Sequence, residues 1–275
     1  MVKIAVPNKG RLNGPVVELL NKAGIRVDSS RKLVSRYKDI EVLFVRTQDI
    51  PELVRDGAAE LGITGLDLVE ETGADVRVSL KLGFGRTRLV LAAPKNLGLR
   101  SPKDVKVGVK VATEFPKLTA KYFKQLGKKV EIVTVSGATE VTPYLGVADM
   151  IVDLVSTGTT LELNNLKIID TIMDSEAVLI SNKSYRNDNM AVSLSSVINA
   201  QSKRYLMVNV PRKNLAKVEK IIPGMQSPTV MDLADGNFVA VHSVVDEDKV
   251  FATIKKLKMI GCKDILVLPI ERLVS

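Results

Sequence analysis

The chain has 275 residues, with 45% hydrophobic residues, 40 Lys and Arg against 31 Asp and Glu, and a formal net charge of +9. This length allows two or three compact domains, and the composition is that of a soluble globular protein. A single Cys, Cys262, and a single His, His242, exclude an internal disulfide framework, Cys/His metal clusters and Ser-His-Asp or Cys-His catalysis at the hydroxyl-rich loop described below.

The sequence also predicts where the protein acts. No apolar run approaches the length of a membrane span, and the N-terminal run is too short for a signal peptide, so we expect a cytoplasmic protein without a membrane partner. The basic residues are scattered and only 4% of residues are aromatic, which argues against nucleic acid as a partner. A small polyanionic substrate accounts for the positive charge equally well.

The first two thirds of the chain repeat one series of elements. The first series comprises a strand over 2–6, a helix over 15–23, a strand over 41–45, a helix over 50–59 and a strand over 61–63. The second series comprises strands over 105–109, 131–135 and 150–152 and a helix over 118–126. A β-α-β-α-β unit that occurs twice predicts two α/β lobes with parallel-rich sheets.

The remaining elements complete one lobe and form a further domain. Residues 82–91 are the predicted crossing between the lobes, and their Gly-x-Gly lacks the strand–turn–helix context of a dinucleotide fingerprint. Strands over 167–172 and 177–181 and a helix over 189–201 return the chain to the first lobe, which is therefore discontinuous. Strands over 205–210, 229–233, 238–245 and 265–270, with helices over 215–222 and 250–260, predict a β-α-β-β-α-β, ferredoxin-like domain. His242 lies on an alternating strand there and is expected to be a packed or interface residue.

One stretch carries the clearest chemical signal. The strand Met150–Val152 is closed by Asp153, and a loop of Ser156, Thr157, Gly158, Thr159 and Thr160 leads into a helix. Such a loop offers hydroxyls and backbone N–H groups without intrahelical partners, which together can bind a phosphate. Asp153 is suited to accept hydrogen bonds from vicinal hydroxyls, so the pair describes a ribose 5-phosphate site. An isolated Ser/Thr/Gly loop is more often an ordinary helix cap, but the order carboxylate, strand, loop and helix favours the functional interpretation.

Cations are expected to face this loop. Ligands of parallel α/β sheets bind at the carboxyl ends of strands, and with two lobes the cleft between them is the expected site. The first-lobe strand ends carry Lys9 and Arg11, then Arg46, then Gly65 and Asp67. Taken singly, each cation could equally be a solvated surface charge.

The stretch around Asp153 resembles a known family signature. The residues that carry the resemblance are Glu140, Gly146, Ala148, Ile151, Asp153, Leu154, Thr157, Gly158, Thr160 and Leu161. Their spacing is similar to the signature of the ATP phosphoribosyltransferase family, which catalyses the first step of histidine biosynthesis. The chain length resembles the long, self-regulated form.

The resemblance implies a fold and an activity. The fold would be two periplasmic-binding-protein-like lobes, residues 1–88 plus 177–200 and residues 89–176, followed by a ferredoxin-like (ACT-like) regulatory domain over 203–275. The reaction would move the 5-phosphoribosyl group from 5-phosphoribosyl 1-diphosphate to N1 of ATP, releasing diphosphate, with Mg²⁺ as cofactor. Histidine would be the feedback inhibitor, and the protein would form homo-oligomers, dimers assembling into hexamers.

The resemblance also implies site residues. The catalytic candidates are Asp153, Glu140, Lys9 and Arg11. The candidates for binding phosphoribosyl diphosphate are Asp153, Leu154, Val155, Ser156, Thr157, Gly158, Thr159 and Thr160. ATP would meet Arg11, Arg46, Gly65 and Asp67, and Mg²⁺ would be held by substrate phosphates together with Glu140 or Asp153. Histidine would contact Asn209, Met225, Thr229, Val244 and Asp264, although Asn209 stands where an acidic residue is expected, and Thr87 where a Cys is frequent.

Two other functions stay open. A two-lobed solute-binding or ligand-sensing protein without catalysis would have the same lobes, but no signal peptide, lipid-anchor Cys or helix-turn-helix is visible. A nucleobase phosphoribosyltransferase would have a similar Thr-Gly-x-Thr loop, but a single-lobed enzyme would not need the duplicated unit or the C-terminal domain.

Overall fold

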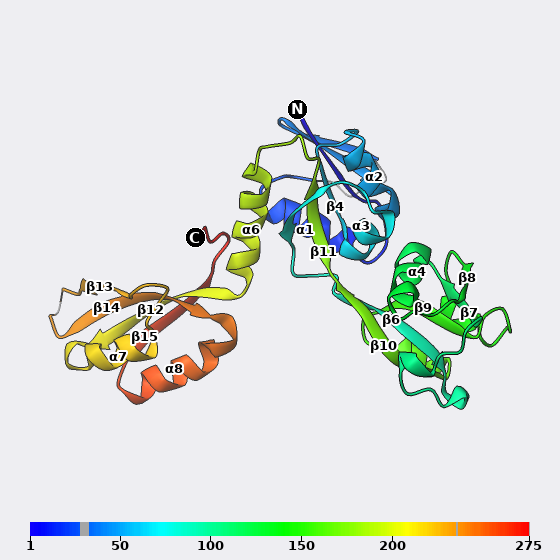
Figure 1. Cartoon of the computed structure of the whole chain (residues 1–275). Coiled ribbons are helices and arrows are strands. Elements are labelled where there is room, and N and C mark those ends of the chain that lie inside the picture. The colour runs from blue at the N-terminus through cyan, green and yellow to red at the C-terminus, as the bar shows by residue number, and fades with distance from the viewer. Residues whose placement is uncertain (28–32, 235, 275) are drawn as a thin grey trace. The chain divides into compact units, whose positions relative to one another are not determined.

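The structure is a computed structural model that describes residues 1–27, 33–234 and 236–274. The chain divides into two compact units, Met1–Asn187 and Asp188–Ser275, and Figure 1 shows their helices and strands. Among the described residues, none of the helices has the length and apolar character needed to cross a membrane.

The first sheet forms the first lobe. Its strands lie in the order β2-β3-β1-β4-β11-β5, and β3, β1 and β4 are parallel. The elements of this lobe are β1 (Val2–Pro7), α1 (Asn13–Lys22), β2 (Val34–Tyr37), β3 (Ile40–Val45), α2 (Ile50–Arg55), β4 (Leu61–Gly65), α3 (Leu66–Thr72), β5 (Arg77–Lys81) and β11 (Ala177–Ser181).

The second sheet forms the second lobe, with strand order β10-β6-β9-β7-β8. Its elements are β6 (Thr87–Pro94), β7 (Lys110–Thr113), α4 (Pro116–Gln125), β8 (Glu131–Thr134), the short 3₁₀ helix η4 (Thr139–Val141), β9 (Met150–Val155), α5 (Thr159–Leu163) and β10 (Leu166–Ser175). Here β8, β7 and β9 are parallel, and they lie in the same relative order as β3, β1 and β4 of the first lobe. The predicted duplication is therefore confirmed, with η4 in place of the second helix.

Two strand connections join the lobes. The chain leaves the first sheet after β5 and enters the second at β6, and it returns from β10 to β11 across Glu176. Thr87, at the start of β6, pairs with Ser175, at the end of β10, so the two connections lie side by side. These connections form the hinge. The predicted domain boundaries remain a prediction: β11 lies in the first sheet, whereas α6 (Asn189–Gln201) belongs to the second compact unit.

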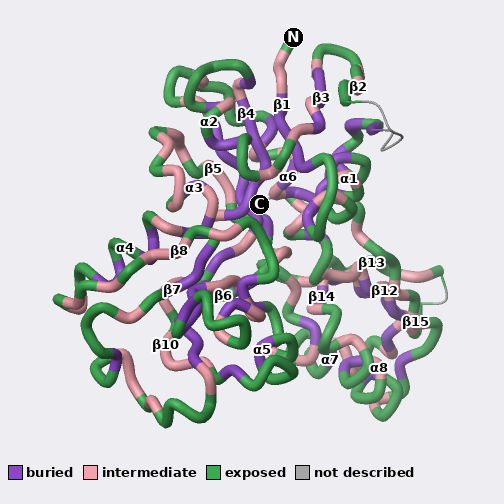
Figure 2. Tube along the Cα trace, turned by 90° about the vertical axis from the view of Figure 1, so that its right-hand side faces the viewer, coloured by how far each residue is buried: buried purple, intermediate pink, exposed green. Residues whose placement is uncertain are grey.

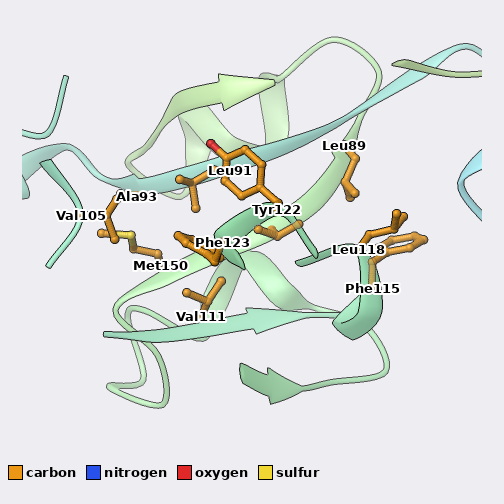
Figure 3. Close-up of a cluster of buried hydrophobic side chains, with 11 residues drawn as sticks. Leu89, Leu91, Ala93, Val105, Val111, Phe115, Leu118, Tyr122, Phe123 and Met150 are labelled. Atoms are coloured by element: carbon orange, nitrogen blue, oxygen red, sulfur yellow. The ribbon is translucent and has the colours of Figure 1, made fainter. Parts of the chain in front are cut away.

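Both faces of the second sheet are buried, because β6 is apolar in successive positions. On one face Leu89 and Leu91 pack with Tyr122 and Phe123 of α4 (Figure 3). On the other face Val90 and Ala92 pack with Ile151, Val155 and Leu161, where Leu161 belongs to α5. Figure 2 shows such buried stretches following the strands. Asp153 alternates with Ile151 and Val155 on β9 and therefore belongs to the α5 face.

Several predicted elements were wrong in position. The strand expected over 105–109 begins instead at Lys110, because Gly108 adopts a φ of +82° in a turn and Val107 is 73% exposed. The helix expected over 50–59 ends at Arg55, two residues before Gly57 with a φ of +74°. Strands β2 and β5 and helix α3 were not predicted, because they are short and lack a clear apolar period.

The second unit contains the predicted ferredoxin-like arrangement. It comprises α6, β12 (Lys203–Pro211), α7 (Leu215–Ile221), β13 (Thr229–Asp232), β14 (Phe238–Asp246), α8 (Val250–Met259) and β15 (Lys263–Pro269). The sheet order β13-β14-β12-β15 is that of a β-α-β-β-α-β unit, which confirms the prediction. Alternate residues of β12 and β14 pack in a core with Val218 of α7 and Leu257 of α8, so the helices cover this face of the sheet. The opposite face carries Tyr205 and His242, whose side chains are hydrogen-bonded at 2.7 Å.

Candidate active site

The phosphate loop, defined as Ser156–Thr160, joins β9 to α5. Gly158 precedes the helix with a φ of +86°, a conformation that glycine adopts without strain. Leu161 is 3% exposed and anchors the helix on the sheet, whereas the four hydroxyl residues of the loop are exposed. The Thr157 and Thr159 hydroxyls lie 3.0 Å apart. The loop therefore presents hydroxyls to solvent beside a helix start, as binding of a phosphate requires.

Asp153 belongs to a set of three neighbouring acidic residues, together with Glu140 and Glu114. Its pKa is raised to about 6, chiefly because burial disfavours the charged form, and further because Glu140 and Glu114 repel a second charge. The Leu154 N–H donates to Asp153 Oδ1 at 2.7 Å and partly offsets this effect. Glu114 follows β7, Glu140 lies on η4 after β8, and Asp153 lies near the carboxyl end of β9, so the three carboxylates lie at the ends of three adjacent parallel strands. Glu114 was not among the candidate residues selected from the sequence.

The cations selected from the sequence lie in the first-lobe loops. Lys9 and Arg11 follow β1, Arg46 follows β3, and all three side chains are exposed. Arg11 Nη2 donates to Thr87 Oγ1 at 3.4 Å, which turns this guanidinium toward the hinge. Thr87 is 5% exposed at the start of β6. The structure thus brings Arg11 to the junction of the lobes, and its contact with a substrate remains a prediction.

A pocket at the hinge connects the phosphate loop with further cations. This hinge pocket has a volume of about 290 Å³ and is lined by Leu66, Lys81, Arg86, Thr87, Arg88, Ser156, Asp174, Ser175 and Glu176. Arg88 pairs with Val155, the residue before the phosphate loop, and on its other side with Asp174. Lys81, Arg86 and Arg88 were not selected from the sequence. Arg86 and Arg88 lie in the segment 82–91, which was interpreted as the crossing between the lobes, although its Arg-Thr-Arg at the start of β6 was visible.

The two residues expected beside the nucleotide lie next to the hinge pocket. The Asp67 N–H donates to Ser175 Oγ at 3.0 Å, and the Ser175 hydroxyl donates back to the Asp67 carboxylate. Asp67 is only 2% exposed, and a Cβ at Gly65 would collide with its carboxylate. The geometry gives both residues a role in joining β4 and α3 to β10. Direct contact between them and a nucleotide remains a prediction.

The expected effector residues fall into two groups on the second unit. Asn209 Nδ2 donates to Asp264 Oδ2 at 2.9 Å, and Asp264 has a φ of +50° where the register of β12 and β15 shifts. Thr229 lies on β13, at the opposite edge of the sheet from β15, so it is three strand spacings, or about 14 Å, from the strand of Asp264. Val244 pairs with Tyr205, and Met225 is 54% exposed before β13. One amino acid cannot span Asp264 and Thr229 within a single chain.

The described residues include no group of three or more His, Cys, Asp and Glu side chains placed to hold a metal ion. Mg²⁺ usually binds through one or two carboxylates, substrate phosphates and waters. Asp153 and Glu140, close enough to the phosphate loop's strand to influence each other's charge, fit that mode of binding.

The chain is similar to known proteins over its whole length. The HisG family, ATP phosphoribosyltransferase, matches residues 46–200, and the HisG C-terminal domain matches residues 200–272. An ATP phosphoribosyltransferase of Methanosarcina acetivorans is 49% identical over 99% of each chain. A chain of the ATP phosphoribosyl transferase (HisG:HisZ) complex from Thermotoga maritima is 32% identical, with a TM-score of 0.65 over 72% of this chain and 99% of that one.

A more distant likeness concerns the fold alone. A putative binding component of an ABC transporter from Wolinella succinogenes, complexed with lysine, is 14% identical with a TM-score of 0.50 over 70% of this chain and 88% of that one. The expected periplasmic-binding-protein-like lobes are thereby confirmed as a fold class. From the matches over both units and the near-complete coverage, the chain belongs to the ATP phosphoribosyltransferase family.

Proposed function

We propose that this chain transfers the 5-phosphoribosyl group from 5-phosphoribosyl 1-diphosphate to N1 of ATP and releases diphosphate. The observation that carries this proposal is the exposed phosphate loop beside Asp153, within the segment that matches the family. The hinge pocket, which Ser156 shares with three cations, supplies the positive charge that a diphosphate or triphosphate needs.

In the proposed reaction the C1–O bond to diphosphate breaks, the oxygen keeps the electron pair, and the N1 lone pair forms the new C1–N bond. The phosphate loop holds the 5-phosphate, and Asp153 accepts hydrogen bonds from the ribose hydroxyls. The nearby carboxylates stabilise the oxocarbenium-like charge that develops on the sugar, because preorganised charges act strongly in a site screened from water. No general base is needed, since N1 has a free lone pair.

Arg11 and the cations of the hinge pocket neutralise the departing diphosphate. Mg²⁺, when bound with substrate, adds positive charge at the phosphates, and Glu140 or Asp153 would help to hold it.

We infer that the reaction is the committed entry into histidine biosynthesis and takes place in the cytoplasm. The second unit supports regulation by histidine, because it matches the C-terminal domain of the family and presents an open sheet face with the Asn209–Asp264 pair. Assembly into homo-oligomers, dimers and then hexamers, is proposed for the same chain.

The activity test uses the purified full-length chain with ATP, 5-phosphoribosyl 1-diphosphate and Mg²⁺, with and without histidine. We expect the N1 adduct by its absorbance and mass, with one diphosphate per adduct. Omitting either substrate, or replacing ATP by free nucleobases, should give no product. Binding of both substrates without any adduct would contradict the proposal and favour a binding protein with the same two lobes.

Arg88 should be one of the residues that bind the diphosphate. We expect Arg88→Gln to raise the KM for 5-phosphoribosyl 1-diphosphate about tenfold, because a charge-assisted contact to phosphate is lost. The matched control is Arg100→Gln, an exposed arginine beyond the other end of β6, which should leave the KM within about twofold. An equal effect of both substitutions would show that only the overall charge matters.

A further inference from the structure

Helix α4 begins without a cap from its own sequence. The residue before the helix, Phe115, makes no side-chain capping hydrogen bond, and Pro116 occupies the first turn. The N–H groups of Lys117 and Leu118, which have no intrahelical acceptor at this position, donate to Glu71 Oε1 and Oε2, each at 2.9 Å. Because Glu71 belongs to α3 of the first lobe, the first lobe supplies the cap of a second-lobe helix.

The contact is reciprocal. Lys117 Nζ donates to the carbonyl oxygen of Thr72, the last residue of α3, at 3.0 Å. A carboxylate thus lies at the positive end of α4 and an ammonium at the negative end of α3, and each charge is stabilised by the helix it meets. The side chains of Glu71 and Lys117 therefore each reach from their own lobe to the other.

These hydrogen bonds join the C-terminal end of α3 to the N-terminal end of α4. An open pocket of about 300 Å³ lies beside the contact, with Leu66 and Glu70 of α3 on one side and Leu118, Lys121 and Tyr122 of α4 on the other. Leu68 of α3 packs against the second-lobe core that includes Leu118 and Tyr122, and the hydrogen bonds of Glu71 and Lys117 add a polar contact at the edge of this packing.

Both helices start at strand ends that belong to the candidate active site. Helix α3 begins directly after Gly65, and Asp67 in its first turn is tied to Ser175 of the hinge. Helix α4 begins two residues after Glu114, a member of the carboxylate group around Asp153. A change in the distance between α3 and α4 therefore changes the distance between the two halves of the site.

We propose that Glu71 and Lys117 form a latch between the lobes that holds the active site at the spacing at which both substrates bind. Glu71 acts as a positioning residue through α4 and touches no substrate. The effect on substrate binding rests on the proposed function, whereas the latch itself does not.

Hydrogen exchange tests the latch without any turnover. In the full-length chain, the amides of Lys117 and Leu118 should exchange slowly, because their acceptor is Glu71, and Glu71→Ala should bring them close to the intrinsic rate. The Thr119 amide, which donates to the Phe115 carbonyl inside the helix at 3.0 Å, should remain protected and reports that α4 is still folded. Equally fast exchange of Lys117 and Leu118 in both proteins would overturn the latch. If Glu71→Ala does not fold, the same comparison is made with Lys117→Met, whose loss of the Thr72 contact should also speed exchange at these two amides.

Steady-state kinetics test the positioning role. Glu71→Ala should raise the KM for both substrates about tenfold and leave kcat within about twofold, since the apparent affinity falls with the fraction of molecules at the binding spacing. Glu71→Gln, which keeps one acceptor oxygen, should give a smaller rise, and the control Glu70→Gln, an exposed neighbour on the same helix, should give none. If the Lys117 and Leu118 amides exchange fast in Glu71→Ala but the KM values are unchanged, the positioning role is overturned. Absence of turnover in the unmodified chain would contradict the proposed function alone.

Discussion

Asp153→Asn is expected to lower phosphoribosyl transfer at least about 100-fold and, at the same time, to make the protein more stable at neutral pH. The loss of activity follows because the amide cannot provide negative charge beside the developing sugar cation, and electrostatic groups of this kind contribute about 10²–10³ in rate. The amide oxygen can still accept from the Leu154 N–H, which the Asp153 carboxylate does at 2.7 Å, so the local backbone should be preserved.

The gain in stability follows from the raised pKa of Asp153, about 6 against an ordinary 3.8. The folded protein binds a proton at Asp153 more tightly than the unfolded chain does. Protonation of Asp153 therefore contributes fully to the stability of the fold below about pH 4, and this contribution is lost as the pH rises through 6. At pH 7 the buried charge costs about 3 kcal/mol, which Asn removes. We expect the Tm of the variant to exceed that of the unmodified protein by about 6–12 °C at pH 7.5, and the difference to vanish near pH 4.

The control is Asp149→Asn, at the other end of the same strand. Asp149 Oδ2 accepts from the Lys110 N–H at 2.7 Å, and an amide oxygen can accept the same hydrogen bond, so neither activity nor Tm should change appreciably.

The Asp153 carboxylate should also set the acid limb of the pH–rate profile, with activity falling below about pH 6 as Asp153 is protonated. An Asp153→Asn protein with ordinary turnover, or with a lower Tm at pH 7.5, would contradict the role given to this residue.

The phosphate loop could be predicted from the sequence because its signal is local. A strand, an acidic residue, a hydroxyl-rich turn with Gly158 and a helix start follow one another within a dozen residues, and the structure has them in this order. The duplicated unit was equally readable, since each copy repeats strand, helix and strand. The strand expected over 105–109 failed because a valine-rich stretch interrupted by Gly108 forms a turn, while β7 itself spans only Lys110–Thr113.

The residues that sequence reasoning missed depend on long-range pairing. Arg88 is placed beside the phosphate loop by its register with Val155, a partner 67 positions away along the chain, and Glu71 meets Lys117 across the lobes. No local period reveals either contact. The Asp67–Ser175 pair likewise spans the hinge, and the short motif around Gly65 gave no sign of this buried junction.

Asp264→Ala is the second substitution with a large expected effect, since it should weaken inhibition by histidine about 10- to 100-fold. The Asp264 carboxylate is exposed, accepts from Asn209 Nδ2 at 2.9 Å, and is the charged member of that pair, so it is suited to bind the α-ammonium group of the inhibitor. Loss of one hydrogen bond to a charged group costs about 1.5–3 kcal/mol, which corresponds to this range.

Asn209→Asp supplies the complementary test, because a second carboxylate beside Asp264 should strengthen binding of the ammonium group and increase inhibition. The measurement is the histidine concentration that halves turnover, taken together with the KM for both substrates, which should stay constant because the second unit has its own core. The control is Glu219→Gln on α7, since that helix covers the opposite face of the sheet. If Asp264→Ala retains full inhibition, histidine binds elsewhere. If inhibition is lost only together with the oligomer, the residues around Asp264 in one chain and those around Thr229 in another form the histidine site together. Asp264 and Thr229 lie at opposite edges of the four-stranded sheet, too far apart for one amino acid to contact both in a single chain.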